Sequence, residues 1–181
     1  MALIDRNDTV FIPIDFQERL VPAMCNKEDV VDKGCRLAEG IKILGIPVIV
    51  TRQYPKGIGD TIPEIKDAVG EHEPADKSTF GCMFCEDFCR KLKEVGRKTA
   101  VVTGMEAHIC VQQTVLQLLD AGYQVYVPVD CIGSRSERDM MWAAERMERA
   151  GAILTTYEAV LYELMQDSKI PEFKAISKIV K

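Results

Sequence analysis

Residues 99–111 read TAVVTGMEAHICV, and this stretch decides the fold. The run Thr99–Thr103 is continuously apolar and β-branched, which predicts a strand that is buried on both faces. Gly104 marks a turn, and a helical pattern follows over His108–Ala121. A buried strand, a tight turn and a crossover helix are typical of a parallel sheet that helices cover on both sides.

The rest of the chain repeats this alternation of strand and helix. Further apolar runs lie at 10–14, 47–51 and 124–128, and a weaker one lies at 152–156. Helical patterns lie at Glu28–Leu44, Cys82–Val95, Glu137–Ala150 and Tyr157–Gln166. Several of these helices are followed by glycine, as helix C-termini prefer. We therefore expect one domain over residues 1–181, a three-layer α/β/α sandwich around a mainly parallel, Rossmann-like sheet with right-handed connections.

Composition narrows the possible functions. The 181 residues are 47% hydrophobic, which is enough for a full core, and the net charge is −5 with both signs scattered. No basic stripe is present, so nucleic acid is not an expected partner. Because acidic residues interrupt the start of the chain, no signal peptide is expected. No apolar run is long enough to predict a membrane span. Seven cysteines, an odd number, favour reduced thiols and a cytoplasmic protein.

One long segment shows neither the pattern of a strand nor that of a helix. Residues 53–80 contain repeated proline and glycine and are expected to be irregular. Loops of this length in a compact domain are usually binding loops or lids, and this one follows a strand.

Polar residues that directly follow apolar strands are the first candidates for a site, because open α/β sheets bind ligands beyond the carboxyl ends of their strands. Asp15 and Gln17 follow the first strand, although a helix cap is an equally good interpretation of Asp15. Cys110 follows the third strand within the predicted first helical turn, where the helix dipole lowers a thiol pKa; a buried structural cysteine is the alternative. Lys77 ends the long segment and is either a partner for such a thiolate or a surface lysine.

The other cysteines offer weaker signals. Cys82, Cys85 and Cys89 have C-x2-C-x3-C spacing, but a fourth metal ligand is missing and the pattern also follows helical core spacing. We assign these three no chemistry. Cys131 follows the fourth strand and is a minor candidate for ligand contact. Nucleotide-binding glycine motifs are absent, so no cofactor is expected.

With these residues in view, the chain resembles the isochorismatase-like cysteine hydrolases over nearly its whole length. The resemblance rests on residues 14–17, 51–57, 76–80 and 104–111, which read IDFQ, TRQYPKG, DKSTF and GMEAHICV. It implies a catalytic triad of Asp15, Lys77 and Cys110. It also implies a cis peptide between Met105 and Glu106, with the N–H groups of Glu106 and Cys110 as donors to an oxyanion.

Two departures shape the expected reaction. Nicotinamidase-like members carry a histidine-containing metal motif where this chain has Arg52-Gln53-Tyr54, so no metal is expected. Isochorismatases proper cleave a vinyl ether without a nucleophilic cysteine, whereas this chain keeps Cys110. We therefore expect hydrolysis of a C–N bond in a small amide-like substrate through a thioester. The alternatives are a vinyl-ether hydrolase and a non-catalytic or redox-sensing thiol protein.

Substrate contacts and assembly are expected on the same grounds. The pocket is expected to be shaped by the following residues: Phe16, Gln17, Tyr54, Phe80 and Cys131. The resemblance also implies a homo-oligomer, for which the tail Ile170–Lys181 is either an interface element or a cap on the core.

Overall fold

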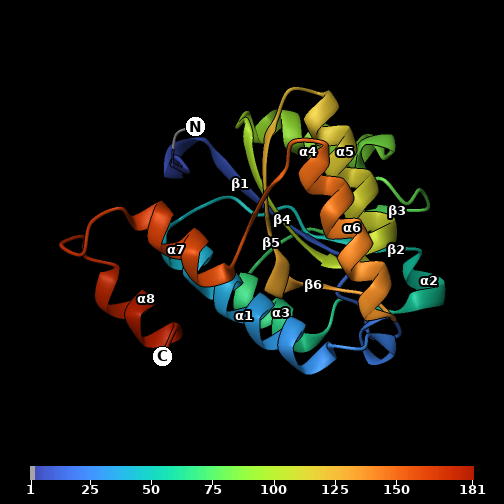
Figure 1. Ribbon diagram of the computed structural model, residues 1–181, viewed down its shortest axis with the longest axis horizontal. Helices are drawn as coiled ribbons and strands as arrows, with labels where there is room; N and C mark the ends of the chain where they lie inside the picture. The colour runs from blue at the N-terminus through green and yellow to red at the C-terminus, as the bar shows by residue number, and fades with distance from the viewer. Residues whose placement is uncertain (1–2) are drawn as a thin grey trace.

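Seven strands lie at the centre of the molecule, with helices on both sides (Figure 1). The computed structural model describes residues 3–181. The strands are β1 (Thr9–Ile14), β2 (Thr51–Gln53), β3 (Ala75–Lys77), β4 (Thr99–Met105), β5 (Gln124–Pro128), β6 (Ile132–Gly133) and β7 (Ile153–Thr155). The helices are α1 (Lys27–Ile43), α2 (Pro55–Ile58), α3 (Pro63–Val69), α4 (Glu86–Val95), α5 (Gln112–Asp120), α6 (Glu137–Arg149), α7 (Tyr157–Met165) and α8 (Phe173–Ile179).

The sheet is parallel at each of its described pairings. Its order is β3-β2-β1-β4-β5-β7, and β6 pairs with the end of β4. Since every strand points the same way, all carboxyl ends meet at one edge. The predicted fold class is confirmed.

Each face of the sheet carries its own apolar core. The first core joins side chains of α1, α3, α7 and α8 to those of strand residues such as Phe11 and Val101. The second joins α4, α5 and α6 to strand residues such as Ile12 and Val102. Successive residues of one strand thus serve opposite cores, which is why the central strands are apolar at every position.

The prediction that residues 53–80 are irregular is wrong. The segment contains α2, α3 and β3. Pro55 and Pro63 begin the two helices, and Gly59 and Gly70 follow their ends. Proline is favourable at the first helical position, because the backbone N–H that it lacks would have no partner within the helix. The residues that suggested a loop are therefore helix boundaries.

The second apolar run is also shifted from its predicted strand. Val48 makes only an isolated bridge to Phe11, and β2 begins at Thr51, where the run was expected to end. The strand itself is the polar sequence Thr51-Arg52-Gln53.

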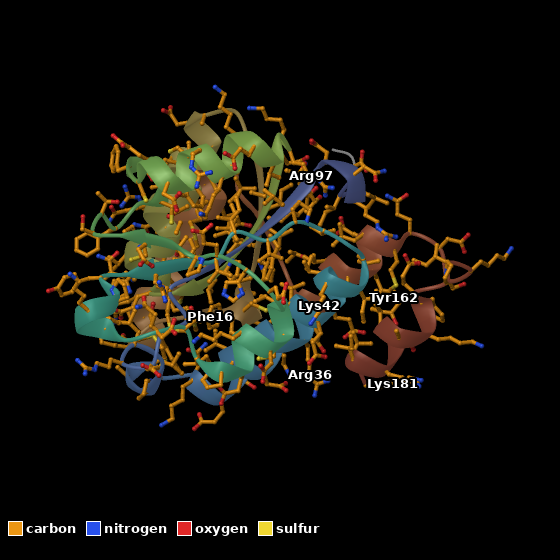
Figure 2. All side chains as sticks on the ribbon, turned by 180° about the vertical axis from the view of Figure 1, so that it is seen from behind. Phe16, Arg36, Lys42, Arg97, Tyr162 and Lys181 are labelled. Atoms are coloured by element: carbon orange, nitrogen blue, oxygen red, sulfur yellow. The ribbon has the colours of Figure 1, made fainter. Side chains whose placement is uncertain are left out.

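The C-terminal tail lies against α1. Ile176 of α8 is fully buried in the first core, and the guanidinium of Arg36 on α1 donates to the Ile179 carbonyl. Figure 2 shows Arg36 close to the end of the chain at Lys181. Within the described chain, the tail therefore caps the core. Across residues 3–181, no helix combines the length and apolarity needed to cross a membrane.

Candidate active site

Asp15 lies at the carboxyl edge of the sheet, directly after β1. Its carboxylate is fully buried and accepts from the Thr51 hydroxyl at 2.8 Å and from the Lys77 ammonium at 2.6 Å. The nearest following helical turn does not begin until Val21, so Asp15 caps no helix. The carboxylate is instead one half of a buried ion pair.

Lys77 is the other half, and it ends β3. Its side chain is only 1% exposed, so the interpretation as a surface lysine is wrong. Besides Asp15, the ammonium donates to Gln53 Oε1 at 2.7 Å and to the Thr79 carbonyl at 3.4 Å. Burial by itself lowers the pKa of Lys77, but the Asp15 carboxylate outweighs burial and raises it. Lys77 is therefore a cation inside the protein.

The pairing of β2 with β3 explains this placement. Gln53 lies opposite Lys77 and both side chains reach the site, whereas Arg52 and Asp76 lie opposite one another one position earlier. Because side chains alternate across a strand, the second pair points to the other face. There Arg52 donates to both carboxylate oxygens of Asp76, at 2.7 and 2.9 Å.

Cys110 joins the Asp15–Lys77 pair from the turn that follows β4. It lies in a π-helical turn, Ala107–Val111, between β4 and α5, and is 5% exposed. Its thiol lies close enough to the Asp15 carboxylate and the Lys77 ammonium to interact with both charges. Three groups far apart in the sequence are thus brought together around one sulfur.

The expectation of a helix-lowered thiol pKa is wrong. Burial and, next, the Asp15 charge raise the pKa of Cys110 well above its ordinary value, while Lys77 only partly opposes them. The residue precedes α5, which begins at Gln112, and sits in an enclosed setting beside an anion. In the resting protein Cys110 is a neutral thiol.

The turn between β4 and Cys110 depends on close backbone approach. Gly104 has φ +116°, and a Cβ at this position would overlap the Ile14 carbonyl oxygen of β1. No other residue fits there without displacing the backbone that carries Asp15. The peptide bond between Met105 and Glu106, just after this glycine, is cis.

Glu106 lies between the turn and β6. Its carboxylate accepts from Arg135 Nε at 2.8 Å. Within residues 3–181, its backbone N–H donates no backbone or side-chain hydrogen bond.

Cys82 belongs to the cluster, which the sequence did not predict. It is fully buried, and its thiol lies close enough to Lys77 and Asp15 to interact with both charges. Its backbone N–H donates to the Thr114 hydroxyl at 3.1 Å. Burial raises its pKa to about 12. Cys85 and Cys89 of the same spacing motif are only partly buried and do not reach Lys77 in the same way. Gln53 was likewise unassigned, and its position opposite Lys77 is visible only once β3 is known.

The expected substrate contacts divide into two groups. Tyr54 and Phe80 are more than half exposed, and Tyr54 lines a cleft of about 330 Å³ that reaches Lys77. Phe16, labelled in Figure 2, is 1% exposed and packs in the first core beside Gly34.

Gln17 and Cys131 are also enclosed. The Gln17 amide is held by the backbone of Gln53, at 2.6 and 3.0 Å, and by the Gly59 carbonyl at 2.7 Å. Cys131 is fully buried in the first core, opposite the core that contains Cys110. The structure therefore does not bring Phe16, Gln17 or Cys131 to the cleft. In the part of the chain that is described, no three His, Cys, Asp or Glu side chains are grouped to hold a metal ion.

Fold and site together define an α/β protein with an Asp–Lys–Cys cluster at the carboxyl edge of a parallel sheet. A family model described as Isochorismatase domain matches residues 9–159. The chain belongs to this family.

Relatives agree with this assignment. Isochorismatase domain-containing protein 1 of Salmo salar is 42% identical over 173 residues, covering 96% of this chain. The match spans 61% of that relative, so this chain corresponds to about three fifths of its length.

Two solved structures are similar to this chain over nearly its whole length. One, described as the MAR1 ribonuclease of Caenorhabditis elegans, is 38% identical with a TM-score of 0.92, covering 99% of this chain and 92% of that one. The other, YcaC of Pseudomonas aeruginosa with hexane-2,5-diol and covalent acrylamide, is 26% identical with a TM-score of 0.92, covering 98% and 91%.

Proposed function

We propose that this protein hydrolyses a C–N bond in a small amide-like substrate, with Cys110 as nucleophile, Asp15 as general base and acid, and Lys77 as the fixed cation. The observation that carries the proposal is the buried Asp15–Lys77 ion pair with the enclosed Cys110 thiol close enough to interact with both charges. A buried ion pair is costly to assemble, and placing a nucleophile against it is typical of a catalytic cluster.

The first half-reaction forms a thioester. Asp15 accepts the thiol proton as the sulfur attacks the substrate carbonyl carbon, and the carbonyl oxygen becomes an oxyanion. The N–H groups of Glu106 and Cys110 are its donors in this proposal. When the C–N bond breaks, protonated Asp15 gives its proton to the departing amine.

The second half-reaction restores the enzyme. Asp15 accepts a proton from water, whose oxygen attacks the thioester carbon, and the C–S bond then breaks. The acid product leaves, and the thiol regains its proton from Asp15. Lys77 remains protonated throughout and offsets the negative charge, which alternates between Asp15 and the reacting atoms.

A covalent adduct tests the proposal directly. Purified protein is screened against small amides and ureides, and intact mass reports any acyl group on the protein. We expect turnover to vanish in Cys110→Ala and to fall by about 10³-fold or more in Cys110→Ser. Turnover that persists in Cys110→Ala would exclude the mechanism.

A ribonuclease is the second candidate, because a similar structure is described as one. The net charge of −5 and the enclosed Cys110 argue against it, since RNA binding requires neutralisation of phosphates. Incubation of labelled RNA with wild-type protein and with Cys110→Ala separates the two: cleavage by both at equal rates would indicate a contaminant, and cleavage by wild type alone would favour the nuclease.

The vinyl-ether and redox alternatives also have distinct outcomes. Vinyl-ether hydrolysis needs no sulfur nucleophile, so Cys110→Ala would retain it. A redox-sensing protein would lose free thiols when treated with peroxide, without any turnover of amides. All seven cysteines are free, which suits a reducing compartment such as the cytoplasm.

Assembly with further copies remains part of the proposal. Met141 and Trp142 are both more than half exposed on α6, and exposed large apolar side chains favour an interface. Sedimentation of wild type and Trp142→Glu tests this: a smaller particle is expected for the variant, and a monomeric wild type would contradict the proposal.

A further inference from the structure

One buried hydroxyl joins the two segments that meet at the candidate nucleophile. Thr114 lies in α5 and is fully buried. Its oxygen accepts from the Cys82 N–H at 3.1 Å and donates to the Cys110 carbonyl at 2.7 Å. Cys82 and Cys110 are therefore linked backbone to backbone through a single side-chain atom.

The link belongs to a longer chain of contacts that begins at Lys77. The Lys77 ammonium donates to the Thr79 carbonyl, and the segment then continues to Cys82, whose thiol also lies near Lys77. Thr114 thus connects the segment after β3, which contacts the fixed cation, to the turn after β4, which carries the nucleophile.

We propose that Thr114 is a positioning residue, whose hydroxyl holds the Cys110 thiol against the Asp15 carboxylate. This inference rests on the proposed function and adds to it a residue that touches no substrate. A hydroxyl bonded to two backbone groups fixes both more firmly than apolar packing alone, because each bond depends on direction.

The arrangement predicts a change in the titration of Cys110. Burial disfavours the Cys110 thiolate most, the Asp15 carboxylate and Cys82 add to this, and the Lys77 ammonium partly opposes them. A thiol that moves away from Asp15 and towards water escapes the two larger effects and titrates at lower pH. Loss of the bridge should therefore lower the apparent pKa of Cys110. A purely structural role would reduce stability and leave this titration unchanged.

The experiment uses iodoacetamide as probe, with peptide mass spectrometry to report the rate at Cys110 alone across a pH series. In this reaction a C–S bond forms, the C–I bond breaks and iodide leaves, so no turnover is needed. We expect the alkylation rate at a given pH below the midpoint to rise about tenfold or more in Thr114→Val, as a fall of about one unit in the thiol pKa produces, and to return to the wild-type value in Thr114→Ser. Unfolding in urea is measured for each variant.

Gln117→Met is the matched control. Gln117 lies on the same helix and accepts from the Met83 N–H at 3.2 Å, so it holds the same segment without reaching Cys110. Its profile should match wild type. An equal shift in this control, or no shift in folded Thr114→Val, would overturn the inference.

A second comparison covers the case in which Thr114→Val does not fold. Thr114→Ala and Thr114→Ser differ only in the hydroxyl, so identical Cys110 alkylation profiles for these two variants would also overturn the inference that Thr114 is a positioning residue. Failure of the proposed function has a different signature, because turnover that persists in Cys110→Ala leaves the alkylation profiles unaffected.

Discussion

Removal of the buried cation is the sharpest test of the site's energetics. In Lys77→Met the chain keeps a similar volume but loses the ammonium, and Asp15 is left with the Thr51 hydroxyl and the Cys110 thiol as partners. Both charged side chains are at most 1% exposed, and their atoms lie 2.6 Å apart. Breaking such a pair by removing one partner costs about 3–5 kcal/mol, because the remaining charge stays buried.

The magnitude is large against the stability of the whole protein, which for a domain is about 5–15 kcal/mol. With a urea dependence of about 1–3 kcal/mol per molar, the unfolding midpoint should fall by about 1 M or more. Asp15→Asn should cost a similar amount. The double variant should cost less than the sum, by about 0.5–3 kcal/mol, because neither charge is then stranded.

A lysine of the same region provides the control. Lys66 pairs with Asp60, but their side chains are 40% and 42% exposed. An exposed pair of this kind contributes about 0–1 kcal/mol, so Lys66→Met should move the midpoint little. If Lys77→Met costs no more than Lys66→Met, the description of Lys77 as a buried, paired cation is wrong.

Three further outcomes are expected. The free energy of unfolding should fall as pH rises from 9.0 towards about 12, because the pKa of Cys82 is raised over that range and the folded state keeps its proton longer; Cys82→Ala should flatten this slope in urea titrations. Asp15→Asn should lower the pKa of Cys110, since the carboxylate charge raises it, and the pH profile of alkylation measures this shift. Gln17→Leu should destabilise by about 1–3 kcal/mol for each Gln53 backbone group left unpaired, and thermal unfolding with unchanged Cys110 alkylation checks that its role is structural.

The strands that could be predicted from the sequence are those made of long apolar runs. β1, β4 and β5 are five to seven residues long and buried, so their composition alone identifies them. β2 and β3 have three residues each and carry the polar pairs of the site, and β6 has two. Short strands with functional side chains lack the apolar signal, because the same residues serve the site and the ion pairs behind it.

The site was predictable to the same extent. Asp15 and Cys110 follow long strands, so their position at the sheet edge can be inferred from local pattern. Gln53 and Cys82 acquire their roles from contacts with Lys77, which lies 24 positions from Gln53. Such contacts depend on the pairing of β2 with β3, and no local pattern encodes it.

The electrostatics of the cluster also decide what Asp15 does for Cys110. If its task were to maintain a thiolate, an anion would be the wrong neighbour, since it raises the thiol pKa rather than lowering it. A carboxylate that lies beside a neutral thiol is instead suited to accept the proton at the moment of attack. In the proposed mechanism the fixed charge of Lys77 keeps Asp15 ionised before the transfer and stabilises the sulfur as it becomes negative. The buried pair therefore fits general-base catalysis by Asp15, and the burial that raises the pKa of Cys110 also keeps the sulfur unreactive until a carbonyl is in place.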